Sequence, residues 1–150
     1  MTNFEFSMEA FCVKTGKHLW GPKYLDFYPL LRISDNNMVY SIYAQENGQM
    51  FICKIDPTNG NLTKYEIKSD KINSKSEFSS ISTIDSNVMY VVIESPITSL
   101  CTIDLETMKL DICQELDTAQ GTWLTEDPIV TKNKIYLYIP LLEELHVLQK

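Results

Sequence analysis

The sequence has few cationic side chains, and Arg32 is its only arginine. Thirteen lysine and arginine residues stand against twenty aspartate and glutamate residues, which gives a formal net charge of −7 at pH 7. Negative charge repels a phosphate backbone, and the paired N–H donors that read guanine come mainly from arginine. We therefore expect no nucleic-acid partner.

A basic leader and a long hydrophobic run are also missing. The opening residues, MTNFEFSMEAF, contain Glu5 and Glu9 but no lysine or arginine. A signal peptide has a basic start followed by an apolar stretch, and a membrane helix needs about 20 mostly apolar residues. The sequence predicts neither, so we expect no membrane association and a cytoplasmic location.

Residue types that support catalysis or metal binding are sparse. The chain has two histidines, and its four cysteines (12, 53, 101 and 113) lack zinc-ligand spacing. It contains no Gly-x-Ser-x-Gly segment and no glycine-rich phosphate loop. We predict no enzyme activity, no metal site and no cofactor. The cysteines are expected to be small buried apolar residues that stay reduced.

An internal repeat accounts for nearly the whole chain. The segments NNMVYSIY, SNVMYVVI and KNKIYLYI each place apolar residues around a tyrosine, namely Tyr40, Tyr90 and Tyr136. A second apolar element precedes a polar turn at Gly16, Gly60 or Met108. Repeats with the spacing of these tyrosines are typical of stacked structural units. We interpret the chain as one domain of about three units, divided at roughly 1–25 (partial), 26–70, 78–117 and 123–150 (partial).

Each unit is rich in β-branched and aromatic residues, with Asn, Asp, Ser, Thr and Gly between short apolar runs. Around Tyr40 both faces of the expected strand are apolar, because Met38, Tyr40 and Ile42 alternate with Val39 and Tyr43. Such a strand must be covered on both sides. We predict an all-β fold of about three four-stranded, propeller-type blades.

Two segments resemble a known repeat. KTGKHLW at 14–20 and DPIVTKNKIYLYIP at 127–140 are similar to the PQQ-like, or quinoprotein-type, β-propeller repeat, in which Tyr40, Tyr90 and Tyr136 would take the inner-strand position. The resemblance implies an architecture and not an activity. Quinoprotein dehydrogenases have a pair of adjacent cysteines, which this chain lacks, so the quinone cofactor is not implied.

Three units are too few to close a ring, because propellers normally have at least four blades. In the repeat frame the chain starts near a third strand, at 6–13, and ends at another third strand, at 143–149. Three explanations follow. The chain is part of a longer propeller, two copies complete one another as a homodimer, or the units form an open β structure.

Acidic residues concentrate in the last third of the chain. From residue 100 onward nine acidic residues accompany four lysines, a charge of −5, against −2 for the preceding part. An aromatic residue ringed by carboxylates suits a basic protein partner. We predict a partner-binding segment, with Trp123 as its anchor unless that ring packs into the core, formed by Glu115, Asp117, Trp123, Glu126 and Asp127.

These observations favour a non-enzymatic, acidic protein-binding domain. One form of this function is an inhibitor or immunity protein that neutralises a basic toxin such as a nuclease, where a negative surface replaces the phosphates. The alternative is a scaffold fragment of a larger PQQ-like β-propeller protein.

Overall fold

The structure, a computed structural model, describes residues 6–34, 36–45, 49–69, 77–95, 98–116, 127–139 and 143–150. In these ranges the regular structure consists of strands alone, which confirms the predicted all-β fold. No helix able to cross a membrane occurs in the described part of the chain. The strands are β1 (Phe6–Phe11), β2 (His18–Leu25), β3 (Leu31–Ile33), β4 (Val39–Ala44), β5 (Met50–Ile55), β6 (Leu62–Glu66), β7 (Glu77–Asp85), β8 (Val88–Ser95), β9 (Ser99–Asp104), β10 (Lys109–Glu115), β11 (Ile129–Val130), β12 (Lys134–Ile139) and β13 (Glu144–Gln149).

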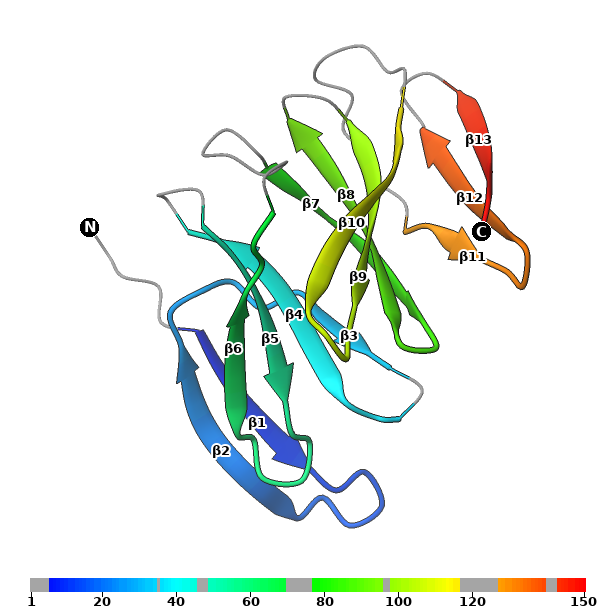
Figure 1. Cartoon of the computed structure of the whole chain (residues 1–150). Coiled ribbons are helices and arrows are strands. Elements are labelled where there is room, and N and C mark those ends of the chain that lie inside the picture. Colours follow the sequence, from blue (N-terminus) through cyan, green and yellow to red (C-terminus); the bar gives the residue numbers. More distant parts are fainter. Residues whose placement is uncertain are drawn as a thin grey trace.

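The strands form four antiparallel sheets, each made from one continuous stretch of chain. In order they are β1-β2, β3-β4-β5-β6, β7-β8-β9-β10 and β11-β12-β13. Strands that follow one another in the sequence pair directly, so short turns suffice to connect them. Figure 1 shows the sheets lying side by side in the order of the sequence.

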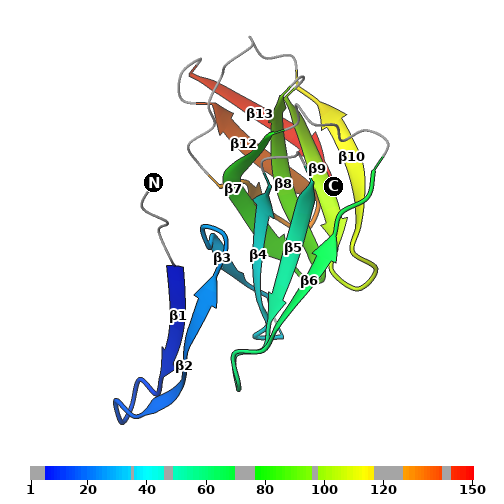
Figure 2. The same ribbon diagram turned by 90° about the vertical axis from the view of Figure 1, so that its left-hand side faces the viewer.

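The second, third and fourth sheets approach one another most closely near their first strands. β3 and β4 contact β7, and β7 contacts β11. The first and last sheets lie at opposite ends of the row in both views (Figures 1 and 2). The described residues therefore form an open row of sheets and no closed ring.

Three hydrophobic clusters fill the three interfaces between neighbouring sheets. Because side chains alternate between the two faces of a strand, an inner strand can contribute residues to two of these clusters. On β8, for example, Met89 and Val91 pack toward the second sheet, while Tyr90 and Val92 pack toward the fourth. This explains why the tyrosine strands are apolar on both faces.

The three tyrosines of the repeat lie at the same place in successive sheets. Tyr40, Tyr90 and Tyr136 are on the second strands β4, β8 and β12, and each pairs with both neighbouring strands. Tyr40 and Tyr90 are 1% and 3% exposed. Tyr136 is half-buried, because no other sheet of the described residues lies against its side of the last sheet.

The polar turns of the repeat also share one geometry. The amide N–H groups of Gly16, Gly60 and Met108 each donate a hydrogen bond to the carbonyl oxygen four residues earlier, at 2.7, 2.8 and 2.8 Å. All three residues have positive φ angles, between 57° and 71°. Glycine adopts this conformation without steric cost, whereas the Cβ atom of Met108 makes it sterically unfavourable.

The cysteines differ in environment. Cys53 and Cys101 occupy equivalent positions on β5 and β9 and are fully buried. Burial raises the pKa of the Cys53 thiol to about 11. Cys12 lies at the turn after β1 and is partly exposed, so the expectation that every cysteine is buried is wrong for this residue. The side chain of Cys113 lies outside the described part of the structure.

Candidate functional site

The structure describes two of the five predicted partner-binding residues. Glu115 is the last residue of β10, and Asp127 lies two residues before β11; both are exposed. Asp117, Trp123 and Glu126 lie outside the described residues, so the role of Trp123 stays a prediction. The two described carboxylates belong to different surroundings.

Asp127 holds three sheets together. Arg32 on β3 donates from Nε to the carbonyl oxygen of Ser82 on β7, at 2.6 Å, and from Nη2 to Oδ1 of Asp127, at 3.0 Å. The amide N–H of Ser82 donates to the same Oδ1 at 3.1 Å. The carboxylate therefore joins the last sheet to the two sheets before it. This position gives Asp127 a structural role that the sequence did not suggest.

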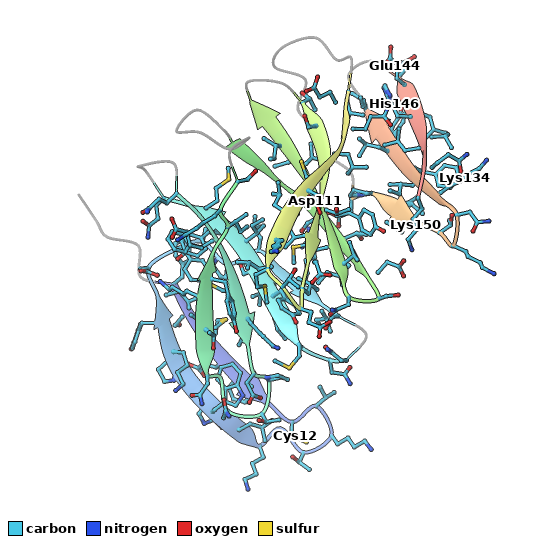
Figure 3. All side chains as sticks on the ribbon, viewed as in Figure 1. Cys12, Asp111, Lys134, Glu144, His146 and Lys150 are labelled. Carbon is cyan, nitrogen blue, oxygen red and sulfur yellow. The ribbon has the colours of Figure 1, made fainter. Side chains whose placement is uncertain are left out.

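Glu115 is one of several exposed acidic residues on β10 and on the turn before it. The exposed acidic residues of this strand and of the turn before it, named the acidic edge from here on, are Asp104, Glu106, Asp111 and Glu115. Lys109 is the only basic residue between positions 98 and 116. β10 pairs with β9 alone among the described strands, and Figure 3 shows Asp111 on it. Charged side chains on such an edge discourage uncontrolled strand pairing, and they also form a negative surface.

The turn before β10 keeps part of this charge fixed in place. Oδ1 of Asp104 accepts hydrogen bonds from the amide N–H groups of Thr107 and Glu106, at 2.7 and 2.9 Å, and from the Thr107 hydroxyl, at 3.0 Å. These bonds, with the Thr107 amide foremost, lower the pKa of Asp104. The carboxylate is thus held in its charged form.

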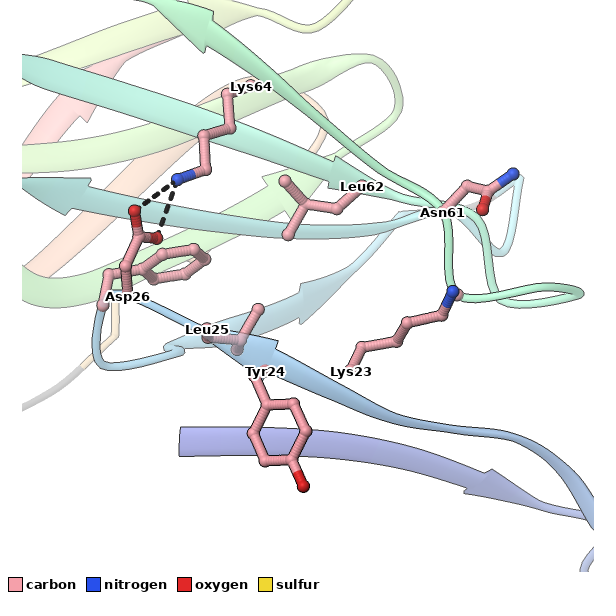
Figure 4. A pocket seen from close by; sticks show the side chains of 9 residues that line it. Lys23, Tyr24, Leu25, Asp26, Asn61, Leu62 and Lys64 are labelled. Atoms are coloured by element: carbon pink, nitrogen blue, oxygen red, sulfur yellow. Dashed lines mark hydrogen bonds and ion pairs between the residues drawn. The ribbon is translucent and has the colours of Figure 1, made fainter. Parts of the chain in front are cut away.

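A cavity of about 470 Å³ opens between β2 and β6. In Figure 4 Leu25 and Leu62 approach each other across it, while Tyr24 points away from β6. Nζ of Lys64 lies 2.7 and 2.9 Å from the two carboxylate oxygens of Asp26 at one end. This contact, chiefly the hydrogen bond from Lys64, lowers the pKa of Asp26.

Aromatic rings lie beneath the Lys64 ammonium. The rings of Phe27 and Tyr43 stack at 4.1 Å between centroids, and Tyr43 stacks on Phe51 at 5.4 Å. Nζ of Lys64 is 5.5 Å from the centroids of both Phe27 and Tyr43, a favourable cation–π distance. The Lys64 charge is thus already matched by Asp26 and the rings. We assign this cluster to the packing of the first sheet on the second.

Sequence reasoning missed the pair Asp26 and Lys64, which are 38 residues apart and belong to no motif. A second contact between the same sheets is made by Trp20. The sequence indicates this residue more clearly, because it is the tryptophan near the repeat turn. Nε1 of Trp20 donates to the carbonyl oxygen of Pro57 at 2.8 Å, and its ring lies against Gly60. A Cβ atom on Gly60 would lie 2.5 Å from Cε3 of Trp20.

The histidines each face one carboxylate. Nε2 of His18 is 3.8 Å from Glu9, and Nε2 of His146 is 3.1 Å from Glu144. Within the ranges that the structure describes, no three His, Cys, Asp or Glu side chains gather into a group suited to a metal ion.

No protein-family model matches this sequence, and no curated protein is significantly similar to it. Function is therefore inferred from the fold and from the surface residues.

Proposed function

We propose that this chain is a non-enzymatic domain of propeller-type blades that binds a basic protein in the cytoplasm. An inhibitor or immunity protein that neutralises a basic toxin, such as a nuclease, is the form of this function that fits the charge best. The observation that carries the proposal is the acidic edge. Four exposed acidic residues accompany one lysine along β10 and its turn.

Electrostatics supports a basic partner in two ways. The net charge of −7 attracts cationic proteins over distances up to the Debye length, about 8 Å at physiological ionic strength. The acidic edge then concentrates negative charge where a partner docks, and complementary charge raises the association rate more than it raises affinity. In the sequence, Glu115 is followed by the other predicted partner-binding residues Asp117, Trp123 and Glu126.

The propeller-type architecture is supported by the contacts of the first strands. In a propeller the first strand of each blade lies nearest the axis, and β3, β7 and β11 are in contact in that manner. The open row also favours the second candidate, a scaffold fragment of a larger PQQ-like propeller. In that case further blades would complete the ring.

Charge-reversal variants test the basic partner. Asp111→Lys combined with Glu115→Lys should slow association with a purified basic nuclease toxin domain by about tenfold, because it removes steering. The matched control combines Glu9→Lys with Glu66→Lys. It changes the net charge by the same amount as the first pair but places the change on the first and second sheets. Asp127 is avoided, because its replacement would break the contact with Arg32 and Ser82.

Association and dissociation rates would be measured by biolayer interferometry at low and physiological salt, against a panel of basic nuclease domains and lysozyme as a basic protein of another class. The proposal requires saturable binding to a nuclease domain, with an association rate that falls as salt rises. Trp123→Ala should mainly speed dissociation if that ring is the anchor. Equal slowing by both double variants would assign the effect to net charge, and unchanged rates would reject the acidic edge as the binding surface.

A further inference from the structure

One face of the last sheet is apolar and uncovered. Strand alternation places one set of side chains of β11, β12 and β13 on the side away from the third sheet, and this set is named the outer face. Its exposed fractions are 66% for Ile129, 43% for Tyr138, 59% for Leu145 and 47% for Val147, and Tyr136 is half-buried. Contiguous exposed apolar surface marks an interaction site more often than chance allows.

The positions of Tyr136, Tyr138 and Leu145 are buried in the two preceding sheets. Tyr138 pairs with Leu145 in the last sheet as Ile42 pairs with Ile52 in the second and Val92 with Leu100 in the third. Ile52 and Leu100 are fully buried, because each faces the next sheet of the row. Leu145 occupies the equivalent place, and among the described residues no sheet lies against it. The outer face therefore has the composition of an interface.

The opposite end of the row has a different character. The outward side of the first sheet mixes Phe11 and Tyr24 with Ser7, Glu9 and His18. Glu9 and His18 approach to 3.8 Å across this surface. The exposed side of the first sheet thus mixes polar and apolar residues, whereas the outer face of the last sheet is apolar between its charged ends.

Charges at the two ends of the last sheet are opposite. Lys134 begins β12 and pairs with Gln149, whereas Glu143 and Glu144 lie at the far end, where Ile139 pairs with Glu144. Lys134, Glu143 and Glu144 are all exposed. Figure 3 shows Glu144 and Lys134 at opposite ends of β12 and β13. A second sheet laid on this face with its strands reversed would bring lysine against glutamate.

We propose that the outer face is the interface of a symmetric homodimer, in which two copies of this chain pack their last sheets face to face. The two-fold axis runs across the strands, so Lys134 of one copy meets Glu143 of the partner subunit at both ends. A two-fold contact closes on itself, whereas a head-to-tail contact would continue into a filament. Tyrosine is enriched in such interfaces. The proposal goes beyond binding of a basic protein and does not depend on it.

Sedimentation of the full chain over a range of concentrations tests the dimer. The wild type should have twice the monomer mass at high concentration, and Leu145→Glu should have the monomer mass throughout. Phe11→Glu is the matched control, since it places the same charge on an equally exposed position of the first sheet, and it should remain dimeric. Circular dichroism and a urea transition verify that each variant is folded.

A charge swap tests the orientation. Lys134→Glu alone would place a glutamate against Glu143 of the partner subunit at both ends of the interface. It should weaken the dimer by about tenfold. Adding Glu143→Lys to it should restore the wild-type dissociation constant. A wild type that stays monomeric at every concentration, or a dimer broken by Phe11→Glu and not by Leu145→Glu, would overturn the proposal. Failure of the swap to restore the dimer would overturn the reversed orientation.

Discussion

Arg32 and Asp127 lie 95 residues apart in the sequence, yet Nη2 of one is 3.0 Å from Oδ1 of the other. The contact joins the first strand of the second sheet to the segment that leads into the last sheet. Ser82 on the third sheet takes part through its backbone. Its carbonyl oxygen accepts a hydrogen bond from Arg32, and its amide N–H donates one to Asp127. The only arginine of the chain thus serves the assembly of the sheets.

Asp127→Ala should lower the free energy of unfolding by about 1 kcal/mol, because it leaves the Arg32 guanidinium and the Ser82 amide without this acceptor. The effect is modest because the Asp127 side chain is 52% exposed. Urea denaturation measures it. Glu115→Ala, which removes an exposed carboxylate from β10, should shift stability by less than about 0.5 kcal/mol. Equal midpoints for both variants would remove the structural role of Asp127.

Tyr90→Ala should destabilise the domain by about 3 to 5 kcal/mol, since it empties a buried aromatic site between the third and fourth sheets. Tyr24→Ala provides the control, because Tyr24 is 71% exposed on the first sheet. Guanidinium denaturation followed by circular dichroism compares the two. A Tyr90→Ala midpoint equal to that of Tyr24→Ala would contradict the assignment of Tyr90 to the core.

Gly60→Ala should destabilise the domain more than Gly16→Ala. Both glycines have φ near +70°, so each substitution costs about 1 kcal/mol of backbone strain. At Gly16 a Cβ atom meets nothing within 4 Å, whereas at Gly60 it collides with the Trp20 ring. Thermal denaturation of the two variants isolates the collision. Similar losses in both would mean that the Trp20 ring moves aside freely.

Stability should fall in acid partly through Asp104. Its pKa is lowered in the folded state by the Thr107 and Glu106 hydrogen bonds, so its contribution is present above the unfolded pKa, about 4. The contribution disappears as the pH falls through the folded pKa. Asp104→Asn should therefore be less stable than the wild type at pH 7, with a difference that shrinks in acid.

Melting temperatures at a series of pH values measure this difference. Glu106→Gln removes a charge from the same turn but keeps the amide that donates to Asp104. Its difference from the wild type should depend less on pH. A pH-independent difference for Asp104→Asn would show that the hydrogen bonds do not favour the charged carboxylate.

The sequence alone determined the strand content, the tyrosine positions and the turns of the repeat. These features are local, because alternation of apolar residues sets the faces of a strand and the residue with positive φ sets the turn. Gly60 and Met108 could be matched from sequence spacing, and the structure places both in left-handed turns with the same hydrogen bond. The acidic residues of β10 could also be identified from the sequence, because the charge of a segment is a local feature.

Only the tertiary structure decided which side chains meet between sheets. Asp127 was predicted from the sequence as a partner-binding residue, and only the structure shows that it also contacts Arg32, where the first strands converge. Asp26 and Lys64 meet because the first sheet packs on the second. Leu145 is exposed while its equivalents are buried, because among the described sheets none packs against its side. Such contacts depend on the relative placement of distant segments, which no local pattern encodes.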